Sequence, residues 1–473
     1  MKRSNQHKDL QGKCLELVNQ NNTINERFDI SGNAFRLNRE SILNNTKANF
    51  TRKQLTVFEK QLSFNGYLFS LLEEIHRFAY LALSEVFMFE ERLKHKDDTT
   101  FFSSRYFLNN SFIHIMGSWE RTLRFSGFIY GYDYSKKSGK SSDVYKALKK
   151  MDSYKSSELS KIIESLKKTG YFPTVEDFRE SNDHRLSKHV EVEQDDDLKP
   201  VAWSCYENGK SLYEIVILFI DQLSRESYIY NEAIDLNILN WETKLDTKKL
   251  ESTVPNELQN QLLEDRLQNN SKYINSAISV FKKMRPIINK FLIELNDQSK
   301  FILLHTDLVF RLHEANRSLN FAYSLIQRSI NKNTELDEEF VCFHNMNYAY
   351  FIDSAIFRIY ATFDKIANIL NTYTEAGYKK VTFEQFMRNY KGFQNDTVLM
   401  KLATSLFLAA EYKELSQLRQ HNFHYITKES FINIHDSEWS NMYNMILASK
   451  NIELLNEIVF EIMSLFINKT TRS

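Results

Sequence analysis

Hydrophobic residues recur at spacings of three and four along extended stretches of the chain. This spacing places apolar side chains on one face of a helix. One stretch carries Leu68, Leu71, Leu72, Ile75, Phe78 and Ala79. Another, between residues 353 and 370, carries Ile356, Ile359, Tyr360, Phe363, Ile366, Ala367 and Leu370. No stretch of useful length alternates apolar and polar residues as a half-buried strand would. The pattern therefore predicts an all-α protein.

The helical pattern repeats itself at a lag of roughly 240 residues, as tandem copies of one unit would. Segments that match in this way begin at Arg77 and Asn320 ("RFAYLAL", "NFAYSLI"), at Tyr106 and Tyr350 ("YFLNNSFIHIMGSWERTL", "YFIDSAIFRIYATFDKIA"), and at Tyr213 and Asn456 ("YEIVILF", "NEIVFEI"). Each match is short, but all occur in the same order. We expect two similar helical bundles that arose by internal duplication and pack as a pseudo-dimer.

The repeat sets the expected domain boundaries. Residues 51–235 form the first unit and residues 300–473 the second. Residues 236–299, between the two units, are polar and charged. We expect them to form a helical connector. The first 50 residues are rich in asparagine and lack clear periodicity. We expect them to form a polar N-terminal arm.

Composition changes this picture little. The chain has only 11 Gly and 4 Pro, which favours long helices joined by short loops. Its formal net charge is zero, so a site for a polyanion has to be local. The three cysteines are far apart, which predicts thiols in a reducing compartment without zinc. With no signal peptide or membrane-spanning stretch, we expect a cytoplasmic protein that needs no cofactor and contacts no membrane.

Two short stretches share one order of chemically active residues. "FRESNDHRL" starts at Phe178 and "LRQHNFHYI" starts at Leu418. Each contains an Arg followed five positions later by a His, namely Arg179 with His184 and Arg419 with His424. Asn182 and Asn422 occupy the same slot within the two stretches. Because the stretches fall at equivalent places in the repeat, they are candidates for two halves of one site.

The two residue types in this motif suit RNA cleavage. Histidine can both take and give a proton near neutral pH, and arginine is a permanent forked donor for a phosphate. One His could remove the proton of a ribose 2′-hydroxyl, while Arg stabilises charge on the phosphoryl oxygens. One motif supplies a single proton-transfer group, whereas two motifs supply a base and an acid. Residues five apart lie about 140° from each other on an ideal helix, so the Arg must reach along the surface.

This arrangement resembles HEPN domains (higher eukaryotes and prokaryotes nucleotide-binding). These are small helical bundles whose ribonuclease members carry an Arg, four to six residues and a His. The resemblance covers both repeat units and implies a metal-independent endoribonuclease. Such domains commonly dimerise to join two motifs, so the tandem repeat would be a covalently linked equivalent. By this resemblance Arg179, His184, Arg419 and His424 are catalytic, and Asn182 and Asn422 are supporting residues.

Further candidates follow from the alignment of the two units. The family often has an acidic residue on an earlier helix, and Glu120 and Asp364 align at such a place. A salt bridge or support of the motif Arg is the favoured interpretation of both. Two aligned loops carry lysines that could contact RNA: Lys136, Lys137, Lys140, Lys379 and Lys380.

The same residues also bear on other functional classes. A helical module that binds RNA, nucleotide or a protein partner without catalysis is the main alternative. The "SGKSS" segment does not fit a phosphate-binding loop, because no apolar strand precedes it. The acidic run from Glu191 indicates a solvated loop rather than a metal site. The resemblance implies RNA as partner, a toxin or antiviral-defence role, and an antitoxin or regulatory protein. A homo-oligomer is compatible with the sequence.

Overall fold

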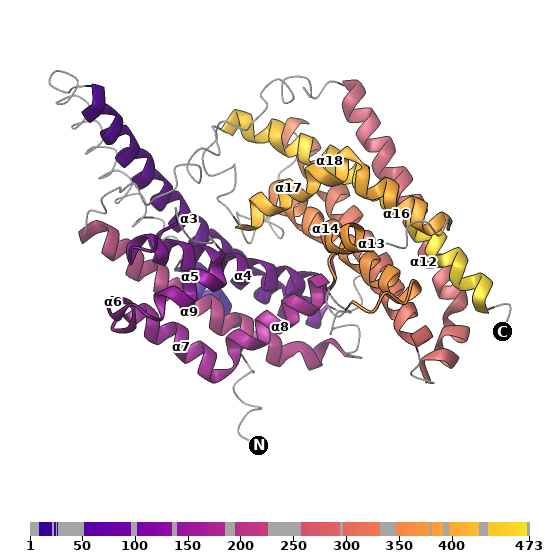
Figure 1. Cartoon of the computed structure of the whole chain (residues 1–473), viewed down its shortest axis with the longest axis horizontal. Helices are drawn as coiled ribbons and strands as arrows, with labels where there is room; N and C mark the ends of the chain where they lie inside the picture. Colours follow the sequence, from indigo (N-terminus) through magenta and orange to yellow (C-terminus); the bar gives the residue numbers. More distant parts are fainter. Residues whose placement is uncertain are drawn as a thin grey trace. The chain divides into compact units, whose positions relative to one another are not determined.

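The structure is a computed structural model in which every element of the described ranges is a helix, and no strand occurs in them (Figure 1). This confirms the all-α prediction. The described residues are 9–20, 23–24, 26, 52–95, 102–134, 140–184, 194–225, 257–293, 297–331, 347–378, 381–390, 397–424 and 434–470. At some helix ends, including 182–184 and 420–424, the description covers the backbone alone.

The chain divides into two compact units, and each is described here by itself. The first comprises Met1–Asp177, Gln194–Asp246 and His424–Phe431. The second comprises Phe178–Glu193, Thr247–Phe423 and Ile432–Ser473. The second half of helix α8, from Phe178 onward, therefore belongs to unit 2. Packing of the units as a pseudo-dimer stays a prediction.

Unit 1 is built around the helices α3 (Arg52–Lys94) and α4 (Ser104–Ile129), which pack along each other. The helix α9 (Lys199–Arg225) packs against both. The apolar stripe predicted on α3 is buried throughout, from Leu68 to Ala79. This confirms the helical periodicity as the signal of a core-facing surface.

Shorter helices connect the long helices of unit 1. They are α5 (Ser141–Leu148), α6 (Asp152–Lys155), α7 (Glu158–Thr169), α8 (Tyr171–His184) and the 3-10 helix η2 (Asp195–Leu198). The helix α1 (Leu10–Asn19) lies within the segment predicted as a polar arm. It packs against α3 and α9, and Leu10, Cys14 and Val18 on one of its faces are buried. Because these three residues are four positions apart, a single short stripe suffices to dock the helix.

Unit 2 is also built around a pair of long helices. Its helices are α12 (Glu257–Ile293), α13 (Asp297–Asn331), α14 (Tyr348–Tyr373), α15 (Phe383–Asn389), α16 (Val398–Leu408), α17 (Ala410–His424) and α18 (Ile434–Thr470). The helices α13 and α14 pack along each other, and α18 packs against both of them and against α12. On α14 the predicted apolar stripe is buried except at Tyr360, which is partly exposed.

Side-chain caps explain where the central helices begin. Ser103 accepts a hydrogen bond from the backbone N–H of Tyr106 at the start of α4. Asn347 accepts one from Tyr350 at the start of α14. Each cap satisfies one of the N–H groups that a helix start leaves without a partner. The two capping residues fall at equivalent positions of the sequence repeat.

Buried ion pairs tie the central helices of each unit together. In unit 1, Arg121 on α4 pairs with Glu74 on α3 at 2.8 Å, and His114 pairs with Glu85 at 2.8 Å. The higher-numbered residue of α4 meets the lower-numbered residue of α3, so the two helices run antiparallel. In unit 2, the basic residues again lie on the second helix of the central pair, α14. Arg358 pairs with Glu314 at 2.9 Å and Lys365 with Asp307 at 3.1 Å.

Two buried histidines make the fold sensitive to acid. Burial lowers the pKa of His76 on α3 and of His305 on α13 from 6.5 to about 4. Between these pH values the unfolded chain binds more protons than the folded one, so the folded state loses stability as pH falls. The contribution of each neutral histidine to the unfolding free energy is fully present above pH 6.5 and is lost below about pH 4. We expect each histidine to remove about 3 kcal/mol of unfolding free energy over this window.

Urea denaturation followed at pH 7, 6, 5 and 4 measures this effect. Replacing His305 by phenylalanine, which does not titrate, should flatten the pH dependence. His95 is a suitable control because its side chain is 62% exposed. A His95→Phe variant that flattened the curve as strongly as His305→Phe would contradict the assignment.

Within the described ranges, no helix contains an apolar stretch that is long enough to cross a bilayer.

Candidate functional site

The two Arg-His stretches lie at matching places in their helices. The helix α8 ends at His184 and the helix α17 ends at His424. In both, the motif Arg lies within the helix and the motif His is its last residue. The two motifs therefore occupy equivalent places at the ends of their helices.

The start of α8 is set by the preceding turn. Gly170 ends α7 with a φ of 81°, a left-handed conformation that glycine adopts without a steric penalty. The hydroxyl of Thr174 donates to the carbonyl oxygen of Gly170 at 2.8 Å. The chain therefore turns at Gly170 and enters α8 at Tyr171, two residues before Pro173.

Arg419 on α17 lies over an aromatic ring of α14. Its guanidinium carbon is 4.7 Å from the ring centroid of Tyr360. A planar guanidinium above a ring gains a cation–π interaction and keeps its fork oriented. Burial raises the pKa of the Tyr360 phenol, the charge of Asp364 raises it further, and Arg419 opposes the shift. The phenol therefore stays protonated near neutral pH.

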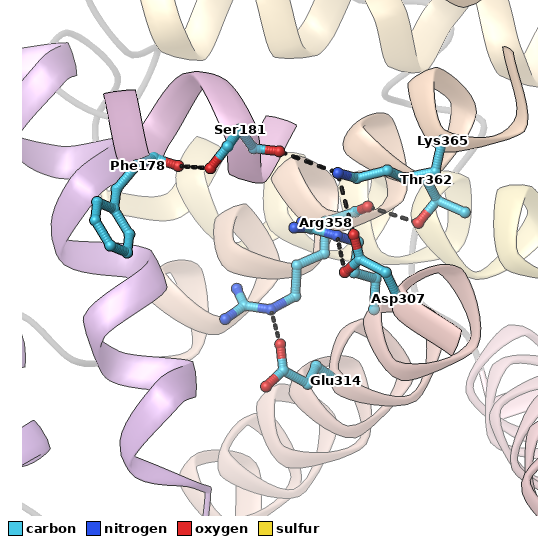
Figure 2. A network of polar contacts seen from close by, with 8 residues as sticks. Phe178, Ser181, Asp307, Glu314, Arg358, Thr362 and Lys365 are labelled. Atoms are coloured by element: carbon cyan, nitrogen blue, oxygen red, sulfur yellow. Dashed lines mark hydrogen bonds and ion pairs between the residues drawn. The ribbon is translucent and has the colours of Figure 1, made fainter. Parts of the chain in front are cut away.

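The first motif is held by a different residue of the same helix. Lys365 on α14 donates from its Nζ to the backbone carbonyl oxygen of Ser181 at 3.1 Å. Ser181 lies between Arg179 and His184, and its own hydroxyl donates to the carbonyl oxygen of Phe178 at 3.0 Å. Figure 2 shows this chain of contacts running from α8 through Lys365 to Asp307.

The buried charges on α13 and α14 form two paired sets. Asp307 bonds Lys365 through Oδ2 at 3.1 Å and Arg311 through Oδ1 at 3.1 Å. Two turns earlier on α14, Arg358 bonds Glu314 (Figure 2). These five side chains are nearly or fully buried. Because a buried charge without compensation is costly, their mutual pairing is what allows the group to exist in a core.

The supporting carboxylates take structural positions. Asp364 is 1% exposed, and its Oδ1 accepts a hydrogen bond from the backbone N–H of Phe383 at 2.8 Å. It thereby anchors the start of α15. Glu120 on α4 is partly exposed. Its neighbour Arg121 is the residue that forms the buried pair with Glu74.

The other predicted residues are described in part. Lys140 is exposed and directly precedes α5. Lys136, Lys137, Lys379 and Lys380 lie outside the described residues. For Asn182, His184, Asn422 and His424 the backbone is helical, and their side chains lie outside the description.

Part of the acidic run that starts at Glu191 has a structural partner. Asp195 in η2 pairs with Arg105 of α4 at 2.6 Å and accepts a hydrogen bond from Ser104. Its carboxylate therefore sits at the start of α4, where a negative charge is favourable. No group of three or more His, Cys, Asp or Glu with metal-ligand geometry occurs among the described residues.

Sequence reasoning missed the role of Lys365 and Asp307. The signal for Lys365 was present, because it aligns with Arg121 in the repeat ("WERTL", "FDKIA"). A basic residue at one position of two buried helices is informative, since lone buried cations are rare. Its contact with Ser181, however, spans 184 residues of sequence and could not be read from a pattern.

Comparison with known families finds a match in the C-terminal part of the chain. Residues 304–471 match the family model of Cthe2314-like HEPN domains, and HEPN domains are associated with ribonuclease activity. The match contains Arg419 and His424 together with the helices α14 and α17. No curated protein and no solved structure gave a significant match to the chain.

Proposed function

We propose that the protein is a metal-independent endoribonuclease whose active site is built from both Arg-His motifs. Arg179 and Arg419 bind the scissile phosphate, and His184 and His424 exchange protons with the ribose and the leaving group. Asn182 and Asn422 support the motifs. The observation that carries the proposal is the Arg419–His424 motif at the end of a helix, within a domain that matches a HEPN family.

The helix α14 supports the joining of the two motifs. Tyr360 lies under Arg419, and Lys365 holds the carbonyl of Ser181 in the first motif. These two anchor residues are five positions apart on one helix, a rise of about 7.5 Å along its axis. They point about 140° apart, so the long side chains of Arg and Lys must provide the remaining reach.

A common origin of the two units supports a paired site as well. In each unit a capped helix carries two buried basic residues about two turns apart. Along the chain, each helix that ends at a motif histidine, α8 or α17, is followed by a long helix, α9 or α18, that packs against a central pair. We infer that the units arose by duplication and that the second copy took the place of a dimer partner.

The chemistry balances without a further reactant. One histidine, in its neutral form, takes the proton of the 2′-hydroxyl, and the resulting oxygen attacks the adjacent phosphorus. The other histidine, protonated, gives its proton to the departing 5′-oxygen. The products are a 2′,3′-cyclic phosphate and a 5′-hydroxyl end. The two guanidinium groups stabilise the additional negative charge on the phosphoryl oxygens during the displacement.

This role suits a growth-arresting enzyme that acts on cellular RNA as a toxin or in antiviral defence. An unregulated ribonuclease would harm its own cell, so we propose an antitoxin or regulatory protein as a partner. The lysine-bearing loops of both units, with Lys136, Lys137, Lys140, Lys379 and Lys380, would guide the RNA backbone.

The function is tested with purified protein and total cellular RNA, in the presence and absence of a chelator. We expect cleavage in both samples, and we expect mapped ends that carry a cyclic phosphate and a 5′-hydroxyl. Cleavage that disappears in chelator would contradict the proposed chemistry. RNA binding without cleavage in either sample would instead support the non-catalytic binding module.

A further inference from the structure

Lys365 is a buried cation with two different kinds of partner. Its side chain is 0% exposed, as is that of Asp307, to which it bonds at 3.1 Å. Its second contact, also at 3.1 Å, is the backbone carbonyl oxygen of Ser181 in α8. Ser181 is itself only 2% exposed. The ammonium group therefore joins the α13–α14 core of unit 2 to the motif segment that begins at Phe178 (Figure 2).

The carbonyl that Lys365 holds has a special place in its helix. Because α8 ends at His184, the carbonyl group of Ser181 lies in the last turn of the helix. A positive charge is favourable at this end, where the aligned peptide dipoles present their negative pole. Ser181 precedes His184 by three positions, so the two residues lie on the same side of the last turn.

A second buried cation on the same helix offers a matched comparison. Arg358 is nearly as deeply buried as Lys365 and bonds Glu314 on α13 at 2.9 Å. Its Nη1 also donates to the carbonyl oxygen of Ser354 on its own helix at 3.1 Å. The pair of Arg358 and Glu314 holds α13 to α14, whereas the contact of Lys365 with Ser181 holds the last turn of the motif helix.

We propose that Lys365 is a positioning residue for the first motif. Its ammonium group fixes the last turn of α8 against α14, and thereby sets the place of Arg179 and His184. Asp307 holds the ammonium group in place through the ion pair between them. The proposed role in RNA cleavage rests on the proposed function, while the anchoring of α8 does not.

Hydrogen exchange measured by mass spectrometry tests the anchoring. In the variant Lys365→Met the apolar stem is kept and the ammonium group is lost. We expect the amide hydrogens in the last turn of α8 to exchange about 10-fold faster or more, because a charge-assisted hydrogen bond has been removed. Arg358→Met is the matched control, since it removes an equally buried cation of the same helix. It should leave exchange in α8 unchanged.

A second variant distinguishes loss of the contact with α8 from general destabilisation of unit 2. Lys365→Met leaves Asp307 with one fewer cation, which could weaken the whole unit. In the double variant Lys365→Met with Asp307→Asn, both charges disappear, and the asparagine oxygen can still accept from Arg311. We expect this variant to fold and to show the same faster exchange in α8. Unchanged exchange there would overturn the proposed anchoring.

Kinetics of RNA cleavage test the positioning. We expect the double variant to lower kcat about 100-fold with KM nearly unchanged, because misplacement of a reacting group mainly affects the chemical step. Arg358→Met should keep kcat per folded molecule. Faster exchange in α8 with an unchanged kcat would overturn the positioning role. If the unmodified protein cleaves no RNA, the proposed function fails, and exchange in α8 still decides whether Lys365 anchors the helix.

Discussion

Replacing His184 and His424 together by alanine should abolish RNA cleavage and leave the fold intact. Each histidine is the last residue of its helix, so alanine at this position leaves the backbone of the helix interior unchanged. Loss of a general acid or base costs about 10²–10⁴-fold in rate, and here both would be lost. The measurement is the cleavage rate of a defined RNA, with circular dichroism to confirm helix content.

The single variants distinguish a composite site from two independent ones. If the two histidines act on one phosphate, His184→Ala and His424→Ala should each lose nearly the full activity, because residues that act as a unit are not additive. If each motif works alone, each single variant should keep about half of the rate. His95→Ala is the control, since this exposed histidine pairs with Glu91 on the surface of α3. Full activity of the double variant would reject the catalytic role of both motifs.

Breaking the ion pair between Arg121 and Glu74 should cause the largest loss of stability in unit 1. Both side chains are 0% exposed, and the guanidinium group also lies 4.2 Å from the ring centroid of Phe78. In Arg121→Met the carboxylate of Glu74 stays buried without its cation. We expect a loss of about 3–5 kcal/mol in unfolding free energy, and a melting temperature lower by roughly 10 °C.

Two further variants locate the cause of this loss. Adding Glu74→Gln to Arg121→Met removes the stranded charge, so much of the stability should return. The surface pair of Lys155 and Asp152 serves as the control, because these side chains are 54% and 96% exposed. Lys155→Met should leave the melting temperature unchanged. If the double variant were no more stable than Arg121→Met, an uncompensated charge would not be the cause.

The helical elements could be predicted from the sequence because their signal is local. The stripe from Leu68 to Ala79 has the spacing of one helix face, and the structure buries all of it. On α14 the same reasoning held for every predicted core position except Tyr360. That tyrosine is partly exposed and lies beneath Arg419, so the exception coincides with the candidate site.

The partners of the buried charges could not be predicted in the same way. Arg121 and Glu74 are 47 residues apart, and a periodic pattern does not say which turn of one helix meets which turn of another. That choice depends on the register in which two helices pack. The helix α1 was missed for a related reason, because its stripe of three apolar residues is short and is surrounded by polar sequence.

The sequence by itself determined that the chain is helical, that its patterns recur along its length, and that two Arg-His motifs share one spacing. These properties follow from residue order, since helix periodicity and motif spacing are set within a few turns. Only the tertiary structure decided that both motif helices end at their histidine and that α14 contacts each of them, through Tyr360 and through Lys365. Such contacts join residues far apart in the chain, and they exist only once the helices have packed.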